Sequence, residues 1–64
     1  MIINIRPLLE CIDGDTRLEI VHADELVYEG PATYDAISAV TRYGLSDVNY
    51  IAVDPEGTLY IEVY

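Results

Sequence analysis

The sequence predicts an α+β fold of two layers, in which two β-hairpins form a four-stranded antiparallel sheet and one main helix covers one face. Three observations predict this fold. Residues 48–64 have the pattern of a complete hairpin, residues 16–30 contain a second pair of alternating runs, and residues 33–43 between them have helical spacing. With a short helix before the first hairpin, the expected order is α-β-β-α-β-β. The sequence leaves the order of strands within the sheet open.

The C-terminal hairpin has the strongest pattern. Val48–Val53 and Thr58–Tyr64 are rich in β-branched and aromatic residues, which favour strands. The segment Asp54-Pro55-Glu56-Gly57 between them suits a tight turn. Its aspartate accepts local backbone hydrogen bonds, its proline presets φ, and its glycine adopts a positive φ without steric cost. We therefore predict a type I turn followed by a glycine bulge.

This turn also predicts the register of the hairpin, with Val53 opposite Leu59 and Ile51 opposite Ile61. Since successive side chains of a strand point to opposite faces, one apolar face is expected to line the core. That face carries Ile51, Val53, Leu59, Ile61 and Val63. The other face is more aromatic than an ordinary solvent face, and it carries Val48, Tyr50, Ala52, Tyr60, Glu62 and Tyr64.

The N-terminal part is short and apolar. Met1–Ile5 is either a fifth, edge strand or an ordered lead-in. Arg6–Ile12 is expected to form a short helix with Pro7 at its first position, where the missing N–H would be unpaired in any case. Arg6 then takes the cap position, because a residue before proline disfavours helical angles. The face expected to be buried contains Leu8, Leu9 and Ile12.

The first hairpin is predicted from two alternating runs, Thr16–His22 and Leu26–Gly30, joined by the loop Ala23–Glu25. We expect Val21 to pair with Val27. In this register the core face consists of Leu18, Ile20, Leu26 and Tyr28.

The same register places Glu19 opposite Glu29. Like charges directly opposite each other destabilise a sheet. Three explanations stay open: the register differs from the expected one, Arg17 relieves the pair diagonally, or the acidic spot is kept for a reason outside folding.

The main helix is predicted over Thr33–Tyr43. Thr33 can cap its N-terminus, and an aspartate in the first turn and an arginine in the last turn suit the helix dipole. Gly44 followed by Leu45 fits a Schellman ending, with Leu45 reaching back to Val40. The expected buried stripe is Ala36, Ile37, Val40 and Tyr43.

The composition bounds the protein class and its partners. The 64 residues suit a single domain, residues 1–64. Twelve acidic residues face three arginines and no lysine, which gives a net charge of −9. Such a charge repels nucleic acid and anionic membranes and attracts basic surfaces. We therefore expect a protein partner with a basic surface, and no direct binding to nucleic acid or membrane.

The cysteine content and the N-terminus indicate the compartment. The single cysteine, Cys11, cannot form an internal disulfide, whereas small secreted domains usually carry several. A secretory signal would begin with a basic region followed by a long apolar run, and the first residues have neither feature. We expect a cytoplasmic protein.

Several short segments form a recurring pattern: Leu8-Leu9-Glu10, Asp15-Thr16, Glu19-Ile20, Val27-Tyr28-Glu29-Gly30 and Gly57-Thr58-Leu59-Tyr60-Ile61. This pattern resembles very small, acidic, uncharacterised proteins encoded by Gram-positive gut bacteria and by their phages or mobile elements. The resemblance covers residues 8–30 and the last strand. It implies an intracellular, phage-linked setting and brings no activity with it.

Residues suited to catalysis are few. His22 is the only histidine and is expected at the rim of the first hairpin, and Cys11 is expected to be a small buried thiol. Two acidic groups could hold a hard cation, but turn chemistry explains both without a metal. They are Asp13-Gly14-Asp15 with Glu19, and Asp54 with Glu56. We predict no enzyme, no catalytic residue, no metal and no cofactor.

Two features indicate an interaction surface instead. The first is a stripe of tyrosines, Tyr50, Tyr60 and Tyr64, on the open sheet face, since tyrosine is enriched at interfaces. Cross-strand packing, or cover by the N-terminal segment, would also explain it. The second is the acid surplus, which exceeds the magnitude of ~2–8 that serves solubility in small domains. Its candidate residues are Glu19, Glu29, Glu62, Asp13, Asp15 and Glu56.

The leading hypothesis is an acidic, non-enzymatic binding protein that inhibits a nucleic-acid-binding protein by imitating nucleic-acid charge. The alternative is a structural, self-associating module, a homodimer through the tyrosine-rich sheet face or a sheet edge.

Overall fold

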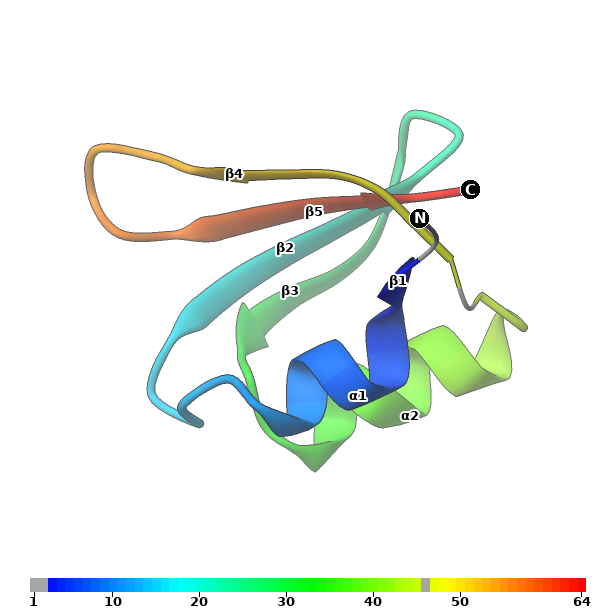
Figure 1. Cartoon of the computed structure of the whole chain (residues 1–64), viewed down its shortest axis with the longest axis horizontal. Coiled ribbons are helices and arrows are strands. Elements are labelled where there is room, and N and C mark those ends of the chain that lie inside the picture. Colours follow the sequence, from blue (N-terminus) through cyan, green and yellow to red (C-terminus); the bar gives the residue numbers. More distant parts are fainter. Residues whose placement is uncertain (1–2, 46) are drawn as a thin grey trace.

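The computed structural model describes residues 3–45 and 47–64, and it has the two-layer α+β architecture that the sequence predicts. Both helices lie on the same side of the sheet, so the opposite face is open (Figure 1). The elements in chain order are β1 (Ile3–Asn4), α1 (Ile5–Glu10), β2 (Arg17–His22), β3 (Glu25–Pro31), α2 (Tyr34–Arg42), β4 (Asp47–Val53) and β5 (Leu59–Val63).

The sheet differs from the predicted one in strand number and direction. It has five strands in the order β1-β4-β5-β2-β3, and β2 pairs with β5 in parallel. The prediction of four antiparallel strands in the order α-β-β-α-β-β was therefore wrong. Each hairpin is antiparallel as expected, but the two hairpins meet through their central strands, which run in the same direction. This arrangement buries both central strands.

The start of the chain contributes the fifth strand and a helix that begins earlier than predicted. Ile3 and Asn4 pair with β4 as an edge strand, while Met1 and Ile2 lie outside the described residues. The N-cap of α1 is Asn4, whose side chain accepts a hydrogen bond from the Arg6 N–H at 3.0 Å. Pro7 thus lies at the third helical position, still within the turn whose N–H groups need no intrahelical partner.

The early helix start has a consequence for the core. Ile5 at the first position of α1 is fully buried together with Leu9, whereas Leu8 and Ile12 are half-buried. The predicted helix range of 6–12 and the capping role of Arg6 were wrong, because a capping asparagine lies two residues upstream of the arginine.

The first hairpin confirms the pairs Ile20 with Tyr28 and Glu19 with Glu29. Beyond Ile20 the register shifts, so that Val21 pairs with Leu26 and Val27 packs against the core. Leu26 is therefore 56% exposed and does not belong to the core face, contrary to the prediction. A β-bulge changes which side chains face inward, and the sequence pattern alone did not reveal this one.

The connection of this hairpin is also tighter than predicted. Only Ala23 and Asp24 lie between the strands, with φ values of +50° and +65°. Two consecutive residues with positive φ are the signature of a type I′ turn, whose twist matches that of the strands it joins. The strand β3 therefore starts at Glu25, which had been assigned to the loop.

The helix α2 spans Tyr34–Arg42, with Thr33 at the N-cap position but without a side-chain capping hydrogen bond. Its predicted ending is confirmed: Gly44 has a φ of +69°, and the Leu45 N–H donates to the Val40 carbonyl at 2.9 Å. Tyr43 is exposed and is not part of the buried stripe, because the helix ends at the preceding residue and leaves its ring beyond the core.

The C-terminal hairpin confirms the predicted turn and the pairs Val53 with Leu59 and Ile51 with Ile61. The Gly57 N–H donates to the Asp54 carbonyl at 3.0 Å, and Gly57 has a φ of +90°. These are the marks of a type I turn with a glycine bulge.

One residue of this hairpin faces the other way from the prediction. The register shifts between Val48 and Tyr50, so Val48 lies opposite Val63 and packs against the core. The bulge at Asn49 inserts one extra residue, and this moves Val48 from the outer face to the inner face.

The buried core lies between the helices and the central strands. Its buried side chains come from α1, α2, β2, β5 and the segments that flank α2, whereas β4 contributes only the partly buried Val48 at its margin. Its members are Ile5, Leu9, Leu18, Ile20, Ala32, Ala36, Val40, Leu45, Ile61 and Val63. The inner face of β4 beyond Val48 is consequently uncovered: Ile51 is 39% exposed and Val53 is 66% exposed.

Replacing Asp54 tests the turn that determines the register of the C-terminal hairpin. The Asp54 Oδ1 accepts the Glu56 and Thr58 N–H groups, each at 2.9 Å. Asp54→Ala should lower the free energy of unfolding by about 1–2 kcal/mol in urea denaturation, because it removes both hydrogen bonds. Two controls should each change stability by less than about 0.5 kcal/mol. Asp54→Asn keeps an oxygen that accepts the two N–H groups, and Glu56→Gln removes one negative charge from the turn without removing this acceptor. Equal losses for all three variants would contradict this role.

Candidate protein-binding face

The open face of the sheet brings together five of the nine predicted site residues. We call this surface the acidic–aromatic face and define it by Glu19, Glu29, Tyr50, Tyr60 and Glu62. Alternation along each strand places these side chains opposite the buried ones, such as Leu18, Ile20 and Ile61.

The ladder pairs arrange this face in two rows across the sheet. One row runs from Ala52 through Tyr60 and Glu19 to Glu29, and the next runs from Tyr50 through Glu62 and Val21 to Leu26. Neighbours within a row are about 4.8 Å apart, and the rows are separated by about 6.6–6.8 Å along the strands. Each row therefore places one tyrosine directly beside a carboxylate on the adjoining strand.

The two tyrosines form one aromatic unit. The ring centroids of Tyr50 and Tyr60 are 6.2 Å apart, with an interplanar angle of 67°, which is the edge-to-face geometry that aromatic pairs prefer. Tyr50 is exposed and Tyr60 is half-buried. The pair presents an apolar surface with two hydroxyl groups on β4 and β5, beside Glu62 and next to Glu19 on β2.

Glu62 is held in place by its neighbours. The Asn49 Nδ2 donates to its Oε1 at 2.9 Å, and the Tyr60 hydroxyl lies 3.5 Å from its Oε2. Asn49 is the extra residue that the bulge inserts into β4. It therefore lies beside β5, the strand that carries Glu62. Sequence reasoning missed the role of Asn49. The signal that could have indicated this role is that Asn49 is a polar residue within the otherwise apolar and aromatic run of residues 48–53.

Burial and charge act together on Tyr60. Partial burial raises the pKa of its hydroxyl above the ordinary value of 10.0, and the negative charge of Glu62 and the hydrogen bond to it raise this pKa further. Asp24 and Glu19 contribute in the same direction. The shift shows that several carboxylates act on one point of this face.

The pair Glu19 and Glu29 keeps the direct cross-strand position that the sequence predicted. Arg17 relieves it diagonally, since its Nη2 lies 3.5 Å from the Glu29 Oε1. Both side chains of this ion pair are exposed, so it contributes only about 0–1 kcal/mol. Within the described residues, Glu19 and Glu62 have no cationic partner.

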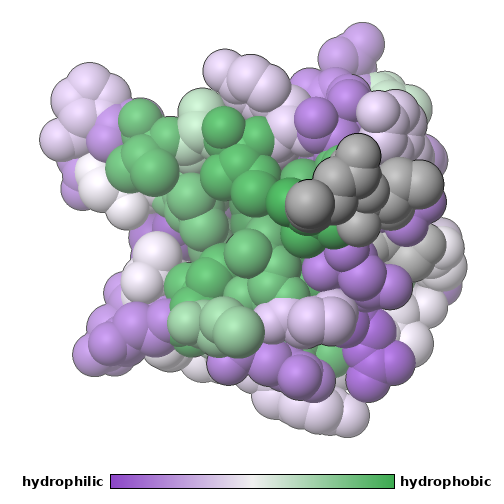
Figure 2. Space-filling view, viewed as in Figure 1, coloured by the Kyte–Doolittle hydropathy of each residue, from purple (hydrophilic) through white to green (hydrophobic). Residues whose placement is uncertain are grey.

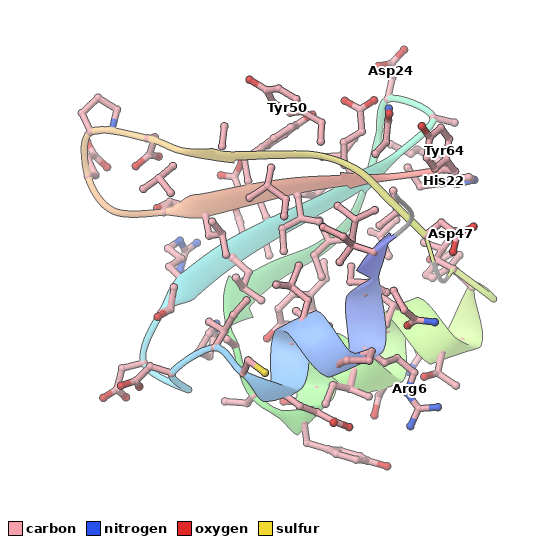
Figure 3. All side chains as sticks on the ribbon, in the orientation of Figure 1. Arg6, His22, Asp24, Asp47, Tyr50 and Tyr64 are labelled. Atoms are coloured by element: carbon pink, nitrogen blue, oxygen red, sulfur yellow. The ribbon has the colours of Figure 1, made fainter. Side chains whose placement is uncertain are left out.

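The remaining predicted site residues lie elsewhere. Asp13 and Asp15 are in the loop between α1 and β2, and Glu56 is in the β4–β5 turn. Both segments are at the end of the sheet where the parallel strands β2 and β5 begin. Tyr64 follows β5 at the opposite end, away from Tyr50 (Figure 3). The predicted stripe of three tyrosines is thus a pair.

Cys11 and Asp13 have ordinary surroundings, whereas the buried Nδ1 of His22 has no hydrogen-bond partner among the described residues. Cys11 is exposed, not buried as predicted, because α1 ends before it. His22 is half-buried at the end of β2, as expected. The Asp13 Oδ1 accepts the Asp15 N–H at 2.9 Å, which is the predicted turn chemistry. Among residues 3–45 and 47–64, no group of three or more His, Cys, Asp or Glu side chains could hold a metal ion.

Comparison with protein-family models, with curated proteins and with solved structures found no match. The resemblance to small acidic proteins of Gram-positive gut bacteria and their phages stays a prediction. Neither helix in the described part of the chain has the length and apolar character needed to span a bilayer.

The titration of Tyr60 tests the electrostatics of this face. Glu62→Gln should lower the pKa of Tyr60 toward 10.0, because it removes a negative charge and a carboxylate acceptor. Absorbance or NMR titration of the wild type and the variant measures this shift. Since the pKa is raised in the folded state, Tyr60 stabilises the fold below pH 10 and loses that contribution as the pH rises through its folded pKa. Glu10→Gln, on α1, should leave the pKa unchanged.

Proposed function

We propose that this chain is a non-enzymatic binding protein whose acidic–aromatic face engages a basic surface of another protein. The observation that carries the proposal is the placement of three carboxylates and an edge-to-face tyrosine pair on one open sheet face. Arg17 is the one basic residue in the adjoining positions of β2, and its guanidinium reaches only Glu29.

Each part of this face suits a cationic partner. Glu62 is oriented by Asn49 and Tyr60, so it loses little side-chain entropy on binding a lysine or an arginine. Tyr50 and Tyr60 offer ring faces for cation–π contacts and large contact areas with few rotatable bonds. The net charge of −9 adds long-range attraction to a basic surface and speeds the encounter.

The class of partner that fits best is a nucleic-acid-binding protein. Glu19 lies about 5 Å from Glu29 across the ladder and about 7–8 Å diagonally from Glu62, a scale comparable with that at which a basic groove receives successive phosphates. In such an imitation the tyrosine rings beside the carboxylates would take over the stacking contacts that bases make. A protein of this kind would inhibit its partner by occupying the groove.

The proposal predicts that a triple variant of the face loses the partner. Glu19→Gln, Glu29→Gln and Glu62→Gln together remove three charges from the face without changing side-chain size. The matched control, Asp13→Asn with Asp15→Asn and Glu56→Gln, removes three charges from the end of the sheet. Asp13 accepts a turn hydrogen bond that asparagine retains. Only the face variant should lose most of its binding.

The measurement is affinity capture from cell extract, with elution in steps of salt between ~0.05 and ~0.5 M, followed by titration of the eluted protein against each variant. Bound protein should elute at moderate salt, and nucleic acid should compete with the chain for it. Equal binding by both triple variants would assign the attraction to net charge alone and refute a role for the face. Binding that is unchanged over the salt range would refute nucleic-acid imitation.

A further inference from the structure

We propose that this protein also forms a homodimer through the exposed edge of β4, which pairs antiparallel with β4 of a second copy about a two-fold axis at Ala52. The surface involved is the edge and the uncovered inner face of β4, distinct from the acidic–aromatic face. It does not rest on the proposed binding to a basic partner, and the two interactions respond to salt in opposite directions.

The edge of β4 is only partly covered. The described strand β1, Ile3–Asn4, pairs with Val48 and Asp47, at the end of β4 away from Ile51 and Val53. Within the described residues, no strand pairs with the outer edge of β4 from Tyr50 to Val53. An unpaired edge offers its N–H and C=O groups to another chain.

The hairpin determines which backbone groups point outward. The Asp54 N–H donates to the Thr58 carbonyl at 3.0 Å, so the Asp54 backbone faces β5. Because this direction alternates along an antiparallel strand, Ala52 and Tyr50 also face β5, while Ile51 and Val53 direct their N–H and C=O groups to the free edge. These two residues therefore have both a free backbone and an uncovered side chain.

The side chains of this edge are apolar and unprotected. Val53 and Ile51 lie on the inner face beyond the reach of the helices, and Ile3 of β1 is exposed beside them. Figure 2 shows an apolar patch between the β4–β5 hairpin and α1, bordered by hydrophilic residues. An exposed patch of this kind marks a contact surface more often than scattered apolar residues do.

The other edge of the sheet shows the contrast. Strand β3 contains Glu25, Glu29 and Pro31, the charges and proline with which proteins prevent edge pairing. The segment from Val48 to Val53 has no charged residue and no proline, although the chain as a whole carries −9. The chain thus protects one edge and leaves the other open.

A second copy fits this edge because the segment is self-complementary. With Ala52 on the two-fold axis, Ile51 of each copy lies opposite Val53 of the other, and each such pair exchanges two backbone hydrogen bonds. The four apolar side chains then meet on the inner face. On the outer face Tyr50 lies opposite Asp54, so no acidic side chain meets another acidic side chain directly across the new pair of strands.

This dimer would extend the acidic–aromatic face. An antiparallel pair related by a two-fold axis normal to the sheet keeps equivalent faces on the same side. The faces of both copies would form one continuous surface, with Tyr50 of each copy near the axis. Since the two copies repel each other through their net charge, salt should strengthen the dimer, whereas it weakens binding to a basic partner.

Sedimentation equilibrium tests the dimer at chain concentrations up to ~1 mM, in ~0.05 and ~0.5 M salt. A dimer that tightens with salt is expected. Val53→Lys should weaken it at least ~10-fold, because it removes a buried apolar contact from each copy. The lysine lowers the net negative charge, so reduced repulsion alone would have the opposite effect. Leu26→Lys, at another exposed apolar position, on β3, should leave the dimer unchanged.

A disulfide tests the register. In the background Cys11→Ser, Ala52→Cys should form a disulfide-linked dimer under mild oxidation, because residues facing each other across the axis have the Cα separation that disulfides need. Leu26→Cys in the same background should not. A chain that is monomeric at every concentration and salt overturns the proposal, and so does a dimer that Val53→Lys leaves intact. A monomer whose captured partner is lost with Val53→Lys would assign the edge to a strand of that partner instead.

Discussion

The parallel pairing of β2 with β5 is the interaction on which the rest of this structure depends. It joins Leu18 to Leu59 at one end and His22 to Val63 at the other, and among the described strands it is the pairing that joins the two hairpins into one sheet. An isolated two-stranded hairpin is at best marginally stable in water. Placing the two central strands side by side gives Leu18, Ile20 and Ile61 neighbours on both sides and complete burial under the helices.

The same pairing makes the molecule asymmetric. The helices cover the core over β2 and β5, and α2 extends over β3, so β4 is left at the margin with Ile51 and Val53 in contact with solvent. The six residues of α1 and the nine of α2 leave the inner face of β4 beyond Val48 uncovered. The absence of charge along this uncovered strip makes it suitable for a second strand.

The outer face carries a charge arrangement that does not favour folding. Negative charge is concentrated on this face, where a sheet would be more stable with mixed charges. Glu19 lies opposite Glu29, and the adjoining strand β5 carries Glu62. Arg17 offsets one carboxylate, and Asn49 orients another without neutralising it. This arrangement costs stability in a small domain with little to spare, and this cost is one ground for the proposed role in binding.

The sequence by itself determined the local structure of this protein. The Asp54–Gly57 turn, the pairing of Ile51 with Ile61, the Gly44 helix ending and the position of Glu19 opposite Glu29 all follow from contacts close along the chain. The tertiary structure decided what depends on distant contacts. The parallel junction of the hairpins, the bulges that turned Val48 inward and Leu26 outward, and the exposure of β4 arise from how the hairpins share a core, and no local pattern records that. For the same reason the sequence named the carboxylates and tyrosines of the candidate face, while only the sheet order showed which of them lie together.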